Sequence, residues 1–295
     1  MDGSNPHFLH ERGAITAVLQ PPVEGARALS WLGRREQLLV ATQDGSLIEV
    51  DPVYGTRKLK GTVQDPARIC ASPDGKLLAV VERGIGIAIH ETRKGERLAE
   101  MPLPLLSEIE LLWFPRPHDQ LGLVVLGRSL DGRLGVVTTP ELDRRKRLRL
   151  PDQVVLGQDA RGHMVYARVL PGGLELVPFG KPLPRAHTSA HRLRYCGKGL
   201  LMGLAEGGVT VWKGKDSQTV MSYDLTAADV HVVGEMVALG TRSGEIAFSR
   251  LSDGSVTRGR PGKVAGHQQA VKQVAFSPSG PWLASCADGV RLWRW

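Results

Sequence analysis

The sequence has few cysteines, no long apolar run and no recognisable signal sequence. Cys70, Cys196 and Cys286 are odd in number, far apart and set in apolar or small-residue stretches, which is typical of buried reduced thiols. No apolar stretch approaches the ~18 residues that span a bilayer. The first residues also lack the basic and apolar regions of a signal peptide. We therefore predict a cytoplasmic protein that does not contact a membrane.

The sequence motifs of common enzyme classes are also missing. No GxxxxGK[ST], GxGxxG, GxSxG, HExxH or CxxC pattern occurs. His187 and His191 have the i,i+4 spacing of a zinc pair, but this spacing brings two ligands together only on a helix. Pro182 and Pro184 precede the pair and argue against a helix there. We therefore predict no catalytic residue, no metal and no cofactor, and a protein that is not an enzyme.

Glycine is abundant, with 35 residues beside 19 prolines. Both residue types favour tight turns, because glycine adopts positive φ angles and proline fixes the first dihedral angle of a turn. A turn glycine followed by a strand-like run recurs seven times, at a mean spacing of about 41 residues. These glycines are Gly45, Gly84, Gly132, Gly173, Gly208, Gly244 and Gly289. The pattern predicts an all-β protein made of seven similar units.

The clearest copy of the repeat is the last one, from Gly266 to Trp295. Gly266 and His267 precede an apolar alternation, and the sequence SPSG at 277–280 then supplies a turn. A second apolar run follows, then the turn pair Asp288-Gly289 and a third run. The order is strand, turn, strand, tight hairpin and strand. The sequences SPDG at 72–75 and AHTSA at 186–190 repeat parts of this pattern.

This last copy resembles the repeat of the WD40 family, which implies a β-propeller of four-stranded antiparallel blades. In that family a His, a Ser or Thr, an Asp and a Trp of one blade form a buried hydrogen-bond chain. The resemblance assigns these positions to His267, Ser285, Asp288 and Trp293. The hairpin before Trp293 is shorter than the family's usual one, which leaves open whether Asp288 reaches His267.

A closed ring needs a strand from the N-terminal part of the chain. The last blade has three predicted strands, so its outer edge would otherwise stay open. The strand-like run Gly13–Leu19 is expected to supply the fourth strand. We thus predict an N-terminal arm over residues 1–12 and a single seven-bladed propeller over residues 13–295. Six or eight blades stay open as alternatives, because the stretch from Leu103 to Pro184 is poorly marked.

The chain carries a net charge of +8, which favours acidic partners. The densest basic run, Arg144-Arg145-Lys146-Arg147-Leu148-Arg149, alternates with leucine as an outer, half-exposed strand would. A phosphate or acidic-peptide contact is the alternative role for this run. No aromatic residues are interleaved with it for base stacking, so sequence-specific RNA binding is not favoured.

Six further cations are predicted to share one face. The resemblance implies that the loops entering the blades and the second hairpin of each blade lie on the face where partners of WD40 propellers dock. It places these basic residues there: Arg27, Arg83, Arg128, Arg192, Arg242 and Lys272. We predict a scaffold that is monomeric by itself, works as a subunit of a larger complex and binds a protein partner with an acidic surface. The alternatives are a hydrolase- or lactonase-like propeller with its site in the central channel, and a basic nucleic-acid-binding propeller.

Overall fold

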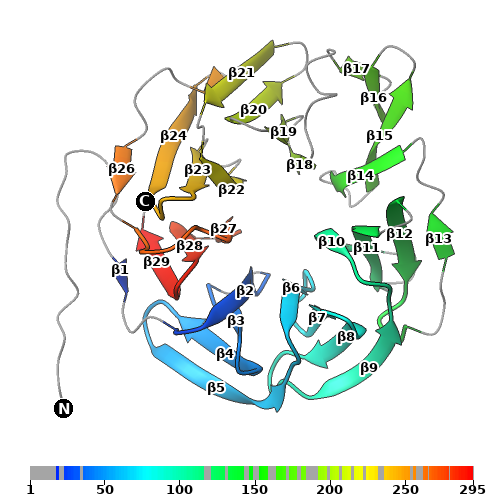
Figure 1. The fold of residues 1–295 in the computed structure, drawn as a ribbon, viewed down its shortest axis with the longest axis vertical. Helices are drawn as coiled ribbons and strands as arrows, with labels where there is room; N and C mark the ends of the chain where they lie inside the picture. The colour runs from blue at the N-terminus through cyan, green and yellow to red at the C-terminus, as the bar shows by residue number, and fades with distance from the viewer. Residues whose placement is uncertain are drawn as a thin grey trace.

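A computed structural model gives the fold of the chain (Figure 1). It describes residues 18–19, 23–33, 36–115, 121–129 and 132–142. Between residues 146 and 221 it describes only the strands, whose bounds are given below. Beyond these it describes residues 224–231, 236–252, 255–256, 262–264, 266–278 and 280–294. The predicted arm over residues 1–12, the AHTSA segment and the pair His187 and His191 lie outside the described residues.

The described strands form seven antiparallel sheets, which stand around a ring like the blades of a propeller (Figure 1). Blade 1 consists of β2 (Ala26–Trp31), β3 (Leu38–Thr42), β4 (Ser46–Asp51) and β5 (Gly55–Thr62). Blade 2 consists of β6 (Pro66–Ala71), β7 (Leu77–Glu82), β8 (Gly86–Glu91) and β9 (Arg97–Pro102). Blade 3 consists of β10 (Ser107–Pro115), β11 (Leu121–Ser129), β12 (Gly132–Thr138) and β13 (Lys146–Leu148).

The remaining sheets continue the ring. Blade 4 consists of β14 (Gln153–Gln158), β15 (Met164–Leu170), β16 (Gly173–Val177) and β17 (Lys181–Leu183). Blade 5 consists of β18 (Arg192–Gly197), β19 (Leu200–Ala205), β20 (Gly208–Lys213) and β21 (Asp216–Met221). Blade 6 consists of β22 (Leu225–His231), β23 (Met236–Thr241), β24 (Ile246–Ser252), β25 (Ser255–Val256) and β26 (Gly262–Val264). Blade 7 consists of β27 (Gln273–Phe276), β28 (Trp282–Cys286), β29 (Val290–Arg294) and β1 (Val18–Leu19).

The all-β fold with four-stranded antiparallel sheets is confirmed, and blade 6 differs from it in one respect. Two short strands share the edge of β24, so this sheet has five strands. β25 forms a hairpin with the end of β24, where Leu251 lies opposite Val256, and β26 pairs with its beginning, where Ile246 lies opposite Val264. β24 has seven residues, whereas β25 and β26 have two and three. Each short strand therefore pairs with only one part of β24.

The blades pack face to face through apolar side chains. In β3, Leu38 and Val40 face blade 7 and pack with Leu292, while Leu39 and Ala41 face blade 2. All five residues of β3 are buried, because neighbouring blades cover both faces of the sheet. This explains the sequence pattern, since strands buried on both faces form continuous apolar runs rather than alternating ones.

The seven turn glycines all lie at the second hairpin of a blade, between its second and third strands. Gly45 and Gly244 have φ angles of 82° and 88°, a conformation that side chains other than glycine's rarely adopt. A Cβ atom at Gly244 would also overlap the carbonyl oxygen of His267. The glycine repeat therefore predicted the register of the blades along the chain. The run at 144–149 supplies β13, the fourth and outer strand of blade 3.

The fourth strand of blade 7 comes from the N-terminal part of the chain. β1 pairs antiparallel with β29, and Val18 lies opposite Trp293. The last two residues of the predicted run Gly13–Leu19 thus lie at the edge of blade 7, and residues 13–17 lie outside the described residues.

Deleting residues 1–19 is expected to leave the edge of β29 unpaired and to convert the monomer into aggregated or insoluble protein. Size-exclusion chromatography of the soluble fraction measures this. The matched control is a deletion of residues 1–12, the arm that we propose lies outside the propeller domain of residues 13–295; it keeps β1 and is expected to stay soluble. A soluble, monomeric product of the longer deletion would show that β1 is dispensable.

Candidate binding face

The last blade contains a continuous hydrogen-bond chain of four side chains. Trp293 Nε1 donates to Ser285 Oγ over 2.9 Å, and Ser285 Oγ lies 2.7 Å from His267 Nε2. The other ring nitrogen of His267, Nδ1, lies 2.6 Å from Asp288 Oδ1. The structure therefore connects by hydrogen bonds the four residues that the resemblance assigned to the buried hydrogen-bond chain. Asp288 reaches His267 despite the short hairpin.

The chain is complete only when His267 is neutral and carries its proton on Nδ1. Ser285 Oγ accepts from Trp293, so its own proton is directed to His267 Nε2 as an acceptor. His267 Nδ1–H then donates to Asp288, whose other oxygen accepts the backbone N–H of Gln268 over 3.3 Å. Each donor has an acceptor, so the three buried residues, His267, Ser285 and Trp293, are held without an unsatisfied group.

The pKa values agree with this arrangement. Burial lowers the pKa of His267 below its usual 6.5, and the hydrogen bond to Asp288 only partly offsets that effect. For Asp288, partial burial acts to raise the pKa, but the hydrogen bonds from His267 and from backbone N–H groups outweigh it and lower the pKa. A neutral histidine beside a carboxylate is the expected state at neutral pH.

Acidification is expected to destabilise the fold, because burial lowers the pKa of His90, His231 and His267. Below the unfolded-state pKa of 6.5 the unfolded chain binds more protons, so stability falls as the pH falls below that value. Each histidine that stays neutral in the fold contributes a loss of at most ~1.4 kcal/mol per pH unit. Urea unfolding at pH 7.5 and pH 5.5 measures the difference.

The matched control for this pH effect is His90→Gln. His90 Nδ1 lies 2.9 Å from the carbonyl oxygen of Gly95, and its buried Nε2 has no hydrogen-bond partner among the described residues, so protonation would bury an unsatisfied N–H group. The glutamine variant lacks one titrating group and is expected to lose less stability between the two pH values. Equal stability of the natural protein at both values would contradict the argument.

One end of the propeller carries both the starts of the first strands and the second hairpins. The register places Ala26 opposite Thr42 in blade 1, and Gln273 opposite Cys286 in blade 7. We call this end the binding face. It includes the Asp288 hairpin of blade 7 and the corresponding hairpins of the other blades.

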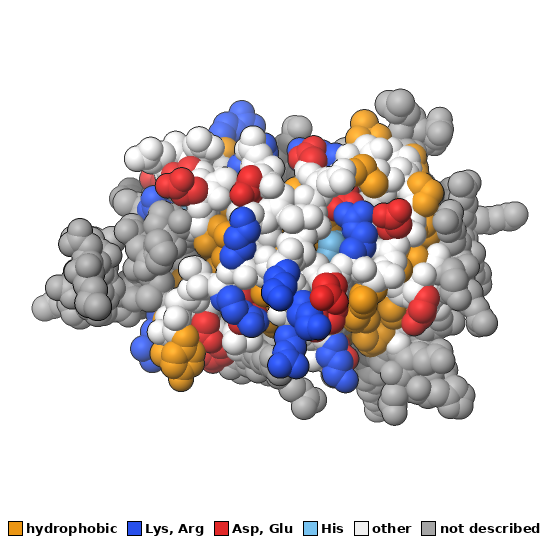
Figure 2. Space-filling model, turned by 90° about the horizontal axis from the view of Figure 1, so that it is seen from below, with side chains coloured by type: hydrophobic (Ala, Val, Ile, Leu, Met, Phe, Trp, Pro, Cys, Tyr) orange, Lys and Arg blue, Asp and Glu red, His pale blue; other side chains and the backbone are white. Residues whose placement is uncertain are grey.

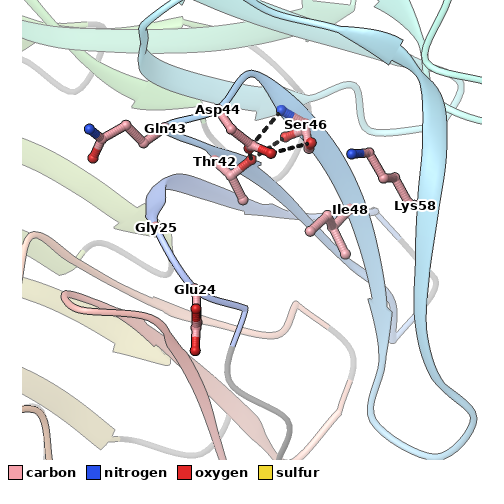
Figure 3. A pocket seen from close by; sticks show the side chains of 8 residues that line it. All are labelled: Glu24, Gly25, Thr42, Gln43, Asp44, Ser46, Ile48 and Lys58. Atoms are coloured by element: carbon pink, nitrogen blue, oxygen red, sulfur yellow. Dashed lines mark hydrogen bonds between the residues drawn. The ribbon is translucent and has the colours of Figure 1, made fainter.

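A pocket opens at the blade 1 part of the binding face (Figure 3). Its lining residues are Glu24, Gly25, Thr42, Gln43, Asp44, Ser46, Ile48 and Lys58. Hydrogen bonds from the hydroxyl groups of Thr42 and Ser46 and from the Ser46 N–H lower the pKa of Asp44 to about 2. Asp44 is therefore an anion at neutral pH that holds its own hairpin together, whereas Asp288 of blade 7 binds His267 and Gln268 in the segment that enters the blade.

The six predicted cations come from six of the seven blades, and the strand register puts each of them at the end of the propeller that carries the second hairpins. Arg27 and Arg192 lie in first strands, and Arg128 lies near the end of a second strand. Arg83 and Arg242 follow second strands, and Lys272 precedes β27. For Arg128 and Arg192 the structure describes only the backbone.

The four described side chains of this set differ in their surroundings. Arg83 is exposed and lies 3.7 Å from Asp65, and the backbone N–H of the exposed Arg242 donates to the backbone carbonyl oxygen of Asp224. Lys272 Nζ donates to the carbonyl oxygen of Ala287 over 2.9 Å. Arg27 is half-buried, and its Nε has no hydrogen-bond partner among the described residues. Among the described residues, Arg83 is thus the one cation of these four with a carboxylate within 4.0 Å, and the four are not equivalent members of a positive ring.

The Cys286 thiol and the grouping of metal-ligating side chains bear on whether the described residues could act in catalysis or metal binding. Burial raises the pKa of the Cys286 thiol to about 12, so this cysteine is not a thiolate at neutral pH. Within the described part of the chain, no three His, Cys, Asp or Glu side chains are grouped as metal ligands would be. The described residues also include no helix that is long and apolar enough to cross a membrane.

Comparison with known proteins relates the last blade to a known repeat and the whole chain to a known fold. The model of the WD domain, G-beta repeat, matches residues 260–293, which contain the hydrogen-bond chain of blade 7. The β-propeller domain of Myceliophteria thermophila Cps50 (Swd1) superposes with a TM-score of 0.68 at 14% identity, over 99% of this chain and 100% of that chain. The chain has the β-propeller fold, and its last blade matches the WD40 repeat.

Other solved structures share the propeller fold. A chain of the mitotic checkpoint complex matches with a TM-score of 0.71 at 15% identity, over 100% of this chain and 97% of that chain. U3-55K matches with a TM-score of 0.67 at 18% identity, over 97% and 99% of the two chains. In sequence, the protein named "Probable cytosolic iron-sulfur protein assembly protein 1" from Botryotinia fuckeliana is 53% identical over 30 residues. That match covers 10% of this propeller and 7% of the relative.

Sequence reasoning did not predict the hydrogen bonds that connect the first strands of neighbouring blades. Trp31 Nε1 donates to the carbonyl oxygen of Ala275 in blade 7, and Trp113 Nε1 donates to that of Cys70 in blade 2, each over 2.8 Å. These bonds link first strands of neighbouring blades. The sequence feature that could have predicted these hydrogen bonds is the tryptophan near the end of the first strand in both blades, β2 and β10.

Proposed function

We propose that this propeller is a non-catalytic platform that binds a protein partner on its binding face, as one subunit of a larger complex. The observation that carries the proposal is the convergence of hairpins from separate blades on one end of a closely packed ring. Because both faces of each described inner sheet are covered, the hairpins are displayed in fixed positions. The similar propeller in the mitotic checkpoint complex supports a role within assemblies.

The proposed partner presents acidic groups to exposed cations of this face. Arg83 and Arg242 are the best candidates, because both are exposed and come from blades 2 and 6. Two anchors on separate blades fix the orientation of a partner, and opposite charge accelerates its association. The platform is expected to be monomeric by itself and to work in the cytoplasm.

Affinity capture of the tagged full chain from its native lysate tests the proposal, with nuclease present and at moderate salt. The test variant is Arg83→Glu with Arg242→Glu, and the matched control is Lys60→Glu with Lys94→Glu, which places the same charge change on the outer side of blades 1 and 2. We expect one or a few stoichiometric protein partners with the natural chain and with the control. We expect at least tenfold less partner with the test variant. An empty capture, or equal capture by both variants, would overturn the proposal.

A further inference from the structure

A second basic surface lies on the outer wall of blades 1 and 2. Figure 2 shows this side of the ring, where Lys and Arg side chains gather over the outer strands at the bottom of Figure 1. Its exposed cations are Arg57, Lys58, Lys60, Lys76, Arg93 and Lys94. We call this set the basic wall. Its members come from three separate segments, so no dense basic run marks them in the sequence.

Backbone contacts hold the three segments of the basic wall together. The N–H groups of Lys60 and Gly61 in β5 both donate to the carbonyl oxygen of Lys94, over 3.0 and 3.1 Å. The N–H of Thr92 donates to the carbonyl oxygen of Lys76 over 3.0 Å. Gly61 approaches Gly95 so closely that a Cβ atom on Gly61 would overlap the Gly95 backbone. The outer strand of blade 1 and a turn of blade 2 thus form one continuous surface.

Much of the positive charge on the basic wall is not neutralised. Arg57 is paired with Glu49 at 2.6 Å, but Lys76 and Lys94 lie 3.9 and 3.8 Å from exposed carboxylates and stay 81% and 61% exposed. No carboxylate of the described residues lies within 4.0 Å of the charged groups of Lys58, Lys60 or Arg93. The nearby Glu91 uses its two oxygens to accept the backbone N–H groups of Arg93 and Lys94.

The composition of the wall indicates the kind of partner. Four of the six cations are lysines, which are depleted at protein–protein interfaces relative to arginine and aromatic residues. Lysines act as point charges on phosphates, which form a regular row of anions in nucleic acids. Leu59 and Thr92, which lie between the cations in the sequence, are buried, and the exposed Tyr54 and Leu98 flank the segments of the wall and do not lie within them.

We propose that the basic wall binds the phosphate backbone of nucleic acid without reading its bases. Binding rests on long-range attraction and counterion release, so it is steeply salt-dependent. The wall and the binding face are different surfaces that adjoin at Lys58, which also lines the blade 1 pocket. A complex could therefore hold its protein partner on one side of the ring and nucleic acid on the other.

The experiment is fluorescence anisotropy of a labelled 20-base-pair duplex of mixed sequence with the purified full chain, between 50 and 200 mM salt. The test variant is Lys58→Ala, Lys60→Ala and Lys94→Ala. Loss of three phosphate contacts is expected to reduce the slope of log affinity against log salt by about 3, because each contact contributes ~0.9. At 50 mM salt we expect at least tenfold weaker binding. Replacing the same lysines with arginine is expected to preserve binding, and thermal melting checks that each variant is folded.

The matched control removes the same charge from the binding face with Arg83→Ala, Arg242→Ala and Lys272→Ala, and it is expected to bind the duplex as the natural chain does. Three results would overturn the proposal: no binding of the duplex at 50 mM salt, equal binding by the test variant, or binding to vesicles with 30% phosphatidylserine but not to the duplex. Because the capture experiment uses nuclease and a different face, either proposal can fail while the other stands.

Discussion

Replacing Trp293 with alanine is expected to lower the free energy of unfolding by about 3–5 kcal/mol, the range for removing a buried tryptophan. Trp293 is 1% exposed and packs against Leu283, Phe276 and Phe248. Its loss would leave a large cavity between blades 6 and 7. It would also remove the N–H donor to Ser285, at the strand that pairs with β1. Denaturant unfolding followed by circular dichroism measures the change.

Trp293→Phe separates the two contributions. Phenylalanine fills much of the cavity but lacks the indole N–H, so the loss is expected to be about 1–2 kcal/mol, as for a single buried hydrogen bond with some lost packing. Ser285→Ala removes the same hydrogen bond from the other side and also the donor to His267. A loss below ~1 kcal/mol for Trp293→Ala would contradict the view that blade 7 is held by this residue.

The hydrogen-bond chain could be predicted from the sequence because its members lie within one repeat. His267 and Trp293 are both in the last blade, and the family pattern fixes the order of the residues between them. The reach of Asp288 could not be decided from spacing alone. A hairpin one residue shorter changes the direction of a side chain, and only the folded turn shows that Asp288 Oδ1 lies 2.6 Å from His267 Nδ1.

Interactions between blades could not be predicted from the residue pattern of a single repeat. Trp31 and Ala275 are 244 residues apart and meet only because the ring brings blade 1 beside blade 7. The basic wall has the same origin, since Lys60 and Lys94 belong to different repeats. The glycine spacing marks each blade, but it carries no information about which side chains face the next one. Such contacts become visible only when neighbouring repeats are placed together.

The ion pair of Glu82 and Arg97 is a further contact that the sequence did not predict, and breaking it is expected to have a large effect on the free energy of unfolding. Glu82 is 1% exposed in its side chain, and its Oε1 accepts from Arg97 Nη2 over 2.6 Å and from the N–H of Gln64 over 2.8 Å. Arg97 also binds Glu100 over 2.8 Å. The pair thus joins the second and fourth strands of blade 2 to the segment after β5.

Arg97→Met is expected to lower the free energy of unfolding by about 3 kcal/mol, because it leaves the buried Glu82 carboxylate without its cation. The value is at the low end of the range for broken buried pairs, since the Arg97 side chain is 29% exposed. Glu82→Gln combined with Arg97→Met removes both charges and is expected to recover part of that loss, since burying two neutral groups costs less than burying one unpaired charge. Denaturant unfolding of the natural chain, both single variants and the double variant completes the cycle. A double variant less stable than Arg97→Met alone would mean that Glu82 stabilises the fold mainly through Gln64 and not through its partner arginine.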